Sequence, residues 1–428
     1  MTAGLGLASW GLVRLWSSFT PERIDVEYEL NKIRAAGLPA TAEELNAWYP
    51  TPPDDQNAAI PLQKAFEAFR DVTDASSPVF GQLPQLNEEL TPEVKAAALE
   101  HVARNGKCLE FIHQATEREH CRLPFQLPAD IDVNLAHVES FAKCGNLLAL
   151  KCLLAAEEHD CDGAFAALND EIRLAHTLCK EPSFMSQLFR AGLHDMFRQS
   201  LEMALNRCPL SEAQLARLQD AVVLETDSEM MFKVLVAERC IDPSATMDRT
   251  PDSKDDSPRP GGSAERLMRY KYLVYMGRLV DASRLPPFER IRAIKQVADD
   301  LNPDDSIVSQ LFHTSDMWVS FLILPTYISL FSDQDRYTAR TTLEQAALAV
   351  ERYRLKRGRA PSSLSELVPE FLDAVPTDPF TMKPLSYEVH GQGYTLHSRA
   401  EYPQNVEMPK GTRKLSKLGE QLSVTVNR

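Results

Sequence analysis

The side chains best suited to metal chemistry lie in one short segment of the chain. Imidazole, carboxylate and thiolate groups are all good zinc ligands, and the segment supplies His113, Glu117, His120 and Cys121. Steps of four and three residues would put the first three on one face of a helix. The spacing is neither the HExxH pattern nor a structural zinc signature. Two interpretations follow: a metal- or thiol-dependent hydrolase with its site near residues 113–121, or a solvated polar helix face ending at a buried cysteine.

A second polar group falls between two helical patterns. It consists of His159, Asp160, Cys161 and Asp162, whose side chains could ligate calcium or zinc. A tight turn between helices also explains the aspartates, because their carboxylates accept hydrogen bonds from nearby backbone N–H groups. We therefore expect a turn here. No GxSxG, Walker A or GxGxxG pattern occurs, so esterase, nucleotide-hydrolase and dinucleotide-binding functions have no local support.

A basic run marks the expected end of a C-terminal helix. The run consists of Arg352, Arg354, Lys356, Arg357 and Arg359. Cations near a helix C-terminus are stabilised by the helix dipole, which by itself accounts for the run. The functional alternative is that these side chains bind an acidic surface of a partner protein.

Composition narrows the classes of function. The 428 residues suffice for two or three domains, and the formal net charge is -15. That charge disfavours nucleic acid as a partner, because phosphate recognition needs an excess of Lys and Arg. It also disfavours a broad electrostatic grip on anionic lipid. With only 17 glycines, the chain does not suit a turn-rich all-β fold. No cofactor is predicted.

All eight cysteines lie between Cys108 and Cys240, and no CxxC pair occurs among them. Cys144 and Cys152 are two helical turns apart, roughly 12 Å along an axis, which is too far for a disulfide. We expect buried thiols that pack as small hydrophobes. Disulfides between different helices are the alternative if the protein leaves the cytoplasm.

The clearest local pattern is a helical hairpin over residues 138–179. Apolar residues recur at steps of three and four on both sides of a polar turn: Phe141, Cys144, Leu148, Cys152 and Ala155, then Ala164, Leu168, Ile172, Ala175 and Cys179. Two amphipathic helices joined this way form an antiparallel hairpin. Residues 158–175 resemble the turn and second helix of a tetratricopeptide repeat, without the Trp and Leu-Gly signature of its first helix.

Helix start and stop signals continue through the first part of the chain. Gly37 is expected to end a helix, and Thr41 with Glu44 forms a capping box for the next one. Ser211 with Gln214 caps a later helix. We therefore expect a mainly α fold built from antiparallel helical hairpins.

The chain divides into six segments by composition and pattern. They are a hydrophobic segment at 1–19, a helical body at 20–241, a polar linker at 242–263, a helical continuation at 264–335, a C-terminal module at 336–400 and a tail at 401–428. Segment 1–19 is a candidate membrane anchor, with an amphipathic helix packed on the body as the alternative. A second apolar run, 317–332, is expected to be a buried core helix.

The C-terminal module combines a helix with short strands. The strings AVERYRLKRGRAPSSLSEL (349–367) and AVPTDPF (374–380) precede two alternating segments that contain Tyr387 and Tyr394. Over residues 336–398 this pattern resembles the type II secretion pseudopilins of the protein G kind, which implies a helix packed on a small antiparallel sheet. The family's N-terminal prepilin-peptidase site and its calcium-binding Asp-Gly loop are absent, so the resemblance does not extend to calcium binding or to assembly into a standard pseudopilus.

The rest of the chain also resembles a known group. The strings GLPATAEELNAWYPTPP (37–53), EHCRLPF (119–125) and EPSFMSQLFRAGL (181–193) are similar to bacterial envelope-type helical proteins that end in the same module. This resemblance implies a place in the cell envelope, inner-membrane anchored or periplasmic, and supplies no activity. The alternative location is the cytoplasm.

The leading hypothesis is a non-catalytic, envelope-associated interaction or scaffold protein with a protein partner. Membrane contact through the N-terminal segment would accompany it. The alternatives are the hydrolase with a site near residues 113–121 and a structural component related to type II secretion or pilus machinery. Fold resemblance alone does not choose among them.

Overall fold

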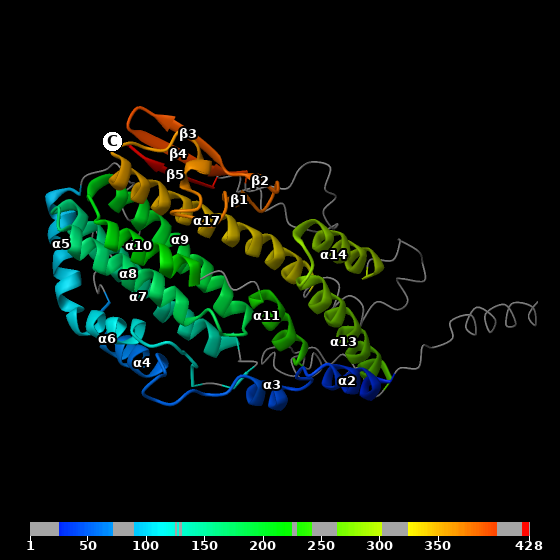
Figure 1. Cartoon of the computed structure of the whole chain (residues 1–428). Coiled ribbons are helices and arrows are strands. Elements are labelled where there is room, and N and C mark those ends of the chain that lie inside the picture. The colour runs from blue at the N-terminus through cyan, green and yellow to red at the C-terminus, as the bar shows by residue number, and fades with distance from the viewer. Residues whose placement is uncertain are drawn as a thin grey trace, which may run out of the picture.

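The computed structural model describes residues 25–71, 90–124, 126–127, 131–224, 229–241, 263–301, 324–399 and 422–427. Over these residues the protein is mainly helical with a small C-terminal antiparallel sheet, as predicted (Figure 1). None of the helices in these ranges has the length and apolarity needed to span a bilayer. The predicted anchor, nearly all of the predicted linker and most of the tail lie outside the described residues.

The helices are α2 (Val26–Ala35), α3 (Ala42–Trp48), α4 (Ala59–Ala68), α5 (Pro92–Arg104), α6 (Gly106–Thr116), α7 (Ile131–Glu157), α8 (Cys161–Thr177), α9 (Phe184–Arg207), α10 (Glu212–Leu224), α11 (Met230–Arg239), α13 (Ser263–Ser283), α14 (Pro287–Leu301), α17 (Leu324–Arg357) and the 3-10 turn η2 (Leu364–Leu367).

Local capping explains several helix ends. Gly37 takes the left-handed φ of 73° just beyond α2, a conformation that costs glycine little. The Thr41 side chain accepts a hydrogen bond from the Glu44 N–H at 3.2 Å, and the Glu44 carboxylate accepts from the Ala40 N–H at 2.8 Å. Both predicted signals are therefore confirmed.

The predicted hairpin is confirmed as α7 and α8, which pack against each other and against α9. Asp160 caps α8 by accepting a hydrogen bond from the Gly163 N–H at 2.9 Å. The aspartate therefore serves as a local backbone acceptor, as the turn interpretation predicted. Leu148, Leu168 and Phe197 are fully buried where these helices meet.

The cysteines are all free thiols, and seven of the eight are buried. Cys161 is the exception and is partly exposed. This confirms the prediction that the thiols pack as small hydrophobes.

The long helix α17 joins the body to the C-terminal module. It packs on α10 along one side and contacts β4 and β5 on another. Its residues 346–350 are consecutive and fully buried, so protein encloses the helix on all sides there. The predicted boundary at residue 336 falls inside this continuous helix. Apolar pattern and linker composition do not reveal that one helix packs first on the helical body and then on the C-terminal sheet.

Residues 335–344 of α17 form a layer of buried and half-buried polar contacts with the body. His194 on α9 and Glu344 on α17 are both fully buried, with His194 Nε2 3.3 Å from Glu344 Oε2. The Arg190 guanidinium donates to the Tyr337 hydroxyl at 2.8 Å. Asp335 forms a buried ion pair with Arg290 of α14.

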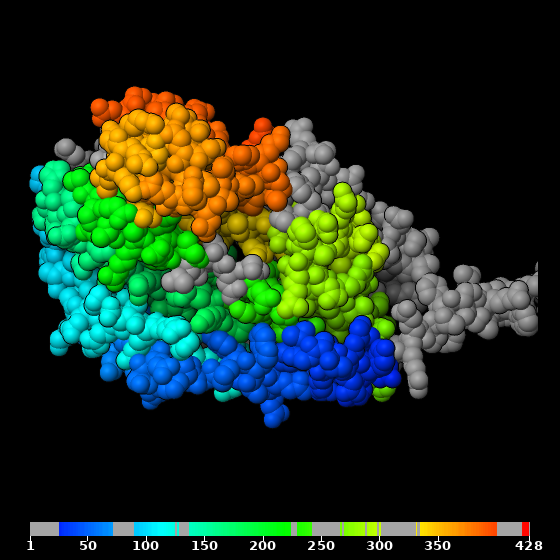
Figure 2. All heavy atoms as spheres, in the orientation of Figure 1, coloured from blue at the N-terminus to red at the C-terminus, as the bar shows by residue number. Residues whose placement is uncertain are grey.

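The described strands form two antiparallel sheets. The hairpin of β1 (Thr377–Asp378) and β2 (Lys383–Pro384) stands beside a three-stranded sheet. The larger sheet has the order β3-β4-β5, with β3 at Ser386–His390, β4 at Gly393–Ser398 and β5 at Leu422–Val426. Figure 2 shows this module packed directly on the helical body.

Strand β5 corrects the prediction that residues 401–428 form only a tail. Leu422, Val424 and Val426 are buried, on the sheet face that contacts α17. Helix α9 binds the backbone of Thr425 through two side chains: Glu202 accepts from its N–H at 3.0 Å, and Asn206 donates to its carbonyl at 2.9 Å.

Replacing Val424 tests whether β5 belongs to the folded core. Val424→Ala should lower the free energy of unfolding by about 2 kcal/mol, because a buried side chain is truncated and a cavity remains. Urea unfolding followed by circular dichroism measures the change. Ser423→Ala, on the half-buried face of the same strand, is the matched control and should change stability by less than about 0.5 kcal/mol. Equal effects of the two variants would contradict a structural role for the strand.

Candidate functional site

The residues of the predicted metal site do not share a helical face. Helix α6 ends at Thr116, so Glu117 is its C-cap and His120 lies beyond it, in a bridge to Asn57. The prediction that steps of four and three place His113, Glu117 and His120 together is therefore wrong. The physical reason is that α6 ends at Thr116, so helical spacing applies to His113 but does not continue to His120.

Each of these side chains meets a different neighbour. His113 Nδ1 lies 3.0 Å from Asp170 Oδ1, and His120 Nδ1 lies 3.5 Å from Lys180 Nζ. Cys121 is buried, and burial raises the pKa of its thiol far above the ordinary range, with Glu181 and Cys179 adding to the rise. A buried neutral thiol is a poor nucleophile. In the described ranges, no three His, Cys, Asp or Glu side chains gather closely enough to hold a metal ion.

Asp170 instead connects the end of α6 to α8. Its buried carboxylate contacts His113 and accepts a hydrogen bond from the Thr116 hydroxyl at 3.0 Å. Arg173, one turn further along α8, donates to the Thr116 carbonyl at 3.1 Å. The Arg173 contact gives the Thr116 carbonyl a partner at the end of α6, where the last carbonyls have no partner within the helix.

Two buried carboxyl groups have strongly raised pKa values. Burial raises the pKa of Glu171 to about 8, with Asp170 adding to the rise and the Ser200 hydroxyl opposing it. Burial also raises the pKa of Glu181 to about 7, against the effect of Arg122, whose Nη1 lies 3.7 Å from it, and of the Tyr49 hydroxyl. Both groups sit inside helix packing, so their shifts follow from desolvation.

The basic run is already engaged within the chain. Acidic partners take all five of its members: Arg352 binds Glu212, Arg354 binds Glu351, Lys356 and Arg357 bind Glu370, and Arg359 binds Glu366. Arg354 donates to the Gln392 carbonyl at 2.7 Å. Through Glu212 these contacts fasten the end of α17 to α10, and through Glu366, Glu370 and Gln392 to the segments that follow the helix. Binding to an acidic partner surface stays a prediction for this run.

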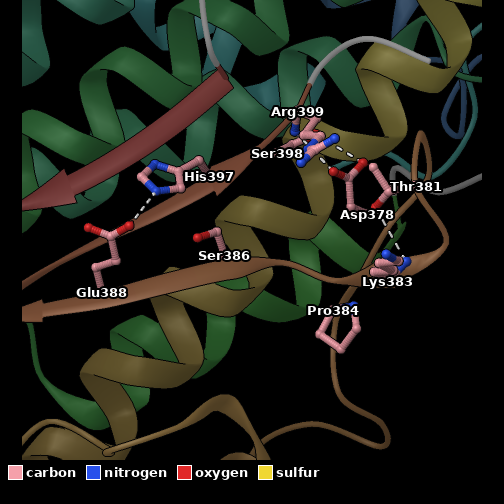
Figure 3. A pocket seen from close by; sticks show the side chains of 9 residues that line it. All are labelled: Asp378, Thr381, Lys383, Pro384, Ser386, Glu388, His397, Ser398 and Arg399. Carbon is pink, nitrogen blue, oxygen red and sulfur yellow. Dashed lines mark hydrogen bonds and ion pairs between the residues drawn. The ribbon is translucent and has the colours of Figure 1, made fainter. Parts of the chain in front are cut away.

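A polar hollow of about 680 Å³ lies on the C-terminal module, between the β1–β2 hairpin and the β3–β4 strands (Figure 3). Its lining consists of Asp378, Thr381, Lys383, Pro384, Ser386, Glu388, His397, Ser398 and Arg399. The lining mixes cationic, anionic and hydroxyl groups. Such a surface suits recognition of a polar chain more than capture of an apolar ligand.

Asp378 at one end of the hollow is saturated by its own fold. Its carboxylate accepts hydrogen bonds from the Phe380 N–H at 2.9 Å, the Ser398 hydroxyl at 3.1 Å and the Arg399 N–H at 2.9 Å. The aspartate is buried and holds the β1–β2 hairpin against the end of β4. It therefore shapes the hollow and is not an available general base.

The other end carries a Ser, a His and a Glu on one sheet face. Ser386 is the cross-strand partner of His397, and His397 Nε2 lies 3.4 Å from Glu388 Oε1. Among the described residues, no hydrogen bond joins the Ser386 hydroxyl to His397. Nucleophilic catalysis needs that contact. The group is a polar surface patch, and sequence could not reveal it because it depends on strand register.

Comparison with protein-family models, curated proteins and solved structures finds no match to this chain.

Removing the Asp170 side chain tests its structural role. Asp170→Ala should lower the free energy of unfolding by about 1–3 kcal/mol, because it leaves the buried Thr116 hydroxyl without this partner. His120→Ala, at an exposed contact, should change stability by less than about 0.5 kcal/mol. Chemical denaturation of both variants measures the difference. If His120→Ala proved the more damaging, residues 113–121 would be held together in another way.

Glu171 should make stability depend on pH. Its folded pKa of about 8 lies above the ordinary value of 4.5, so the folded state holds the proton more tightly. Stability should therefore fall as the pH rises from about 4.5 to about 8, by up to about 1.4 kcal/mol per pH unit. Glu171→Gln should remove that part of the slope and unfold at higher urea than the wild type at pH 8. Parallel pH profiles for the two proteins would contradict the assignment.

Proposed function

We propose that this chain is a non-catalytic interaction protein whose partner adds an extended segment to the edge of strand β3. The single observation that carries the proposal is the asymmetry of the C-terminal sheet. One of its edges is bound by the helical body, whereas the other ends at a short strand of mostly exposed residues. An edge strand presents backbone N–H and C=O groups that can pair with another chain.

The two edges differ in their backbone partners. On β5, Glu202 and Asn206 of α9 occupy the N–H and carbonyl of Thr425. Strand β3 pairs only with β4 among the described strands, and Figure 1 shows it on the side of the sheet away from α8 and α10. Among the described residues, the outer edge of β3 is therefore the open one.

The turn fixes which groups of β3 face outward. His390 pairs with Gly393 across a two-residue turn, so this pair closes the hairpin. Because hydrogen-bonded and non-hydrogen-bonded pairs alternate in an antiparallel ladder, the N–H groups of Tyr387 and Val389 point away from β4. An added segment would accept hydrogen bonds from both.

The polar hollow gives such a segment side-chain contacts. Ser386 and Glu388 alternate with the outward N–H positions and lie on the face that carries the hollow. Every second side chain of the added segment would therefore lie beside Glu388 and Lys383. Symmetrical pairing of two copies about Glu388 would set two carboxylates opposite each other, which is unfavourable. A segment with a basic residue opposite Glu388 fits better.

The family resemblances support a particular setting for this role. The C-terminal module resembles pseudopilins, and the wider chain resembles envelope-type proteins. We therefore propose a cell-envelope or secretion component as the partner class. The tetratricopeptide-like hairpin of α7 and α8 would contribute to the scaffold and not to an array. The hydrolase alternative would require His113, Glu117 and Cys121 to act together, whereas their surroundings differ.

Val389→Pro tests the docking edge. Proline removes an outward N–H without removing a bond to β4, and edge strands tolerate it. Full-length tagged wild-type protein recovered from gently cross-linked native cells should carry its partner. The amount of partner recovered with Val389→Pro should be about tenfold lower, because one backbone hydrogen bond is worth about 1 kcal/mol and the proline ring also obstructs pairing.

Val389→Ala is the matched control, because it truncates the same exposed side chain and keeps the N–H. It should recover the partner as the wild type does. Circular dichroism checks that both variants fold. Equal recovery by all three proteins would place the docking surface elsewhere, and recovery of the wild type without any partner would contradict the interaction role.

A further inference from the structure

Two cysteines from distant parts of the sequence meet where two turns between helices face each other. Cys161 is the first residue of α8, and Cys208 is the C-cap of α9. The Cys208 thiol lies in hydrogen-bonding contact with the Cys161 thiol. Cys161 also packs against the core cluster to which Cys208 belongs.

Independent contacts on both sides hold the two turns together. At the end of α7, Glu157 Oε1 lies 3.1 Å from Nη1 of Arg207, which is at the end of α9. Asp162, next to Cys161, accepts a hydrogen bond from the Gln214 side chain of α10 at 2.8 Å. The thiol pair therefore sits between two fixed cross-links, which restrict the motion of both backbones. This restriction favours the specific geometry that a disulfide requires.

The two thiols differ in access to solvent. Cys161 is partly exposed, whereas Cys208 is 1% exposed. Burial and then the neighbouring Cys161 raise the pKa of Cys208 to about 12. A reagent from solution would therefore meet Cys161 first, and Cys208 would act second from inside the core.

We propose that Cys161 and Cys208 form a thiol–disulfide site that exchanges with low-molecular-weight disulfides of the glutathione class. The Cys161 thiolate attacks one sulfur of the external disulfide, breaks its S–S bond and releases one thiolate. Cys208, whose proton passes to the thiolate released in the first step, then attacks Cys161 Sγ in the mixed disulfide and releases the second thiolate. The two cysteines lose two electrons and two protons in total, and the external disulfide is reduced to two thiols.

The site is independent of the proposed docking edge, because it lies in the helical body. A Cys161–Cys208 disulfide would join the α7–α8 turn directly to the α9–α10 connection. It would reinforce the Glu157–Arg207 and Asp162–Gln214 contacts with a covalent bond. The folded body would then be more stable under oxidising conditions than under reducing ones.

The chain supplies its own control for this chemistry. Cys108 and Cys144 are also in thiol–thiol contact, but both are fully buried. If contact between thiols were sufficient, both pairs would be oxidised. If access to solvent is also required, only the Cys161–Cys208 pair would be oxidised. Cys152 is near Cys208 as well, yet it is fully buried and offers no entry from solution.

The test treats the full-length folded protein with oxidised glutathione at about pH 8.5, where more thiol is ionised. Free thiols are then blocked, and peptides are mapped without reduction by mass spectrometry. We expect a linked peptide pair containing Cys161 and Cys208, with Cys108 and Cys144 recovered as blocked thiols. The oxidised protein should melt roughly 4 °C higher than the reduced one.

Two single variants separate the steps. Cys208→Ser should accumulate a stable mixed disulfide on Cys161, and Cys161→Ser should leave Cys208 unmodified. The proposal would be overturned by a wild type in which Cys161 remains as the mixed disulfide. Oxidation of Cys108 and Cys144 instead, or a bond from Cys208 to Cys152, would overturn it too. Because the wild-type map decides the matter alone, an unfolded variant would not prevent a result.

Discussion

Helix α17 joins the helical body to the C-terminal sheet, because it contacts α9, α10, α11 and α14 in the body as well as β1, β4 and β5 in the sheet module. Its middle turns, residues 346–350, are buried on every side because α10 covers one flank and strands β4 and β5 cover another. Because burial of apolar side chains is the main favourable contribution to folding, these turns stabilise the contact between the helical body and the C-terminal module. The turns before it are more polar and less completely enclosed, and they meet α9 through the buried His194–Glu344 contact. The helix therefore joins a body held partly by matched polar groups to a module held by apolar packing.

The C-terminal module depends on the body for one of its sheet edges. Leu422–Val426 completes the sheet, yet Glu202 and Asn206 of α9 satisfy the backbone of its central Thr425. At the other end, the basic side chains that close α17 fold back onto Glu366 and Glu370. In the part of the chain that the structure describes, these contacts leave β3 as the unpaired edge of the sheet. The proposed docking region is therefore the edge that neither α9 nor another strand covers.

Local signals in the sequence were sufficient for local structure and insufficient for long-range structure. Thr41, Gly37 and Asp160 act within one turn of their own position, and their roles were predictable because capping depends on adjacent backbone groups. The spacing of His113 and His120 fits a helix. The position where α6 ends, however, depends on the hydrogen bond between Thr116 and Asp170, which are far apart in sequence. The strand at Leu422–Val426 had a usable signal, alternating apolar and hydroxyl side chains, that its position near the end of the chain obscured. Ion pairs of the basic run and the register of Ser386 against His397 depend on the assembled fold.

The continuity of α17 also has a consequence for how its length can change. Each residue of an α-helix turns the chain by about 100° and advances it by about 1.5 Å. Adding or removing one residue between the contacts to α9 and the contacts to β4 would swing the whole sheet around the helix axis, away from the groups that bind β5. A change of seven residues returns the phase to within about 20° but shifts the sheet by roughly 10 Å. The number of residues between Glu344 and the buried turns at 346–350 therefore fixes how the C-terminal sheet is rotated about the α17 axis relative to the helical body.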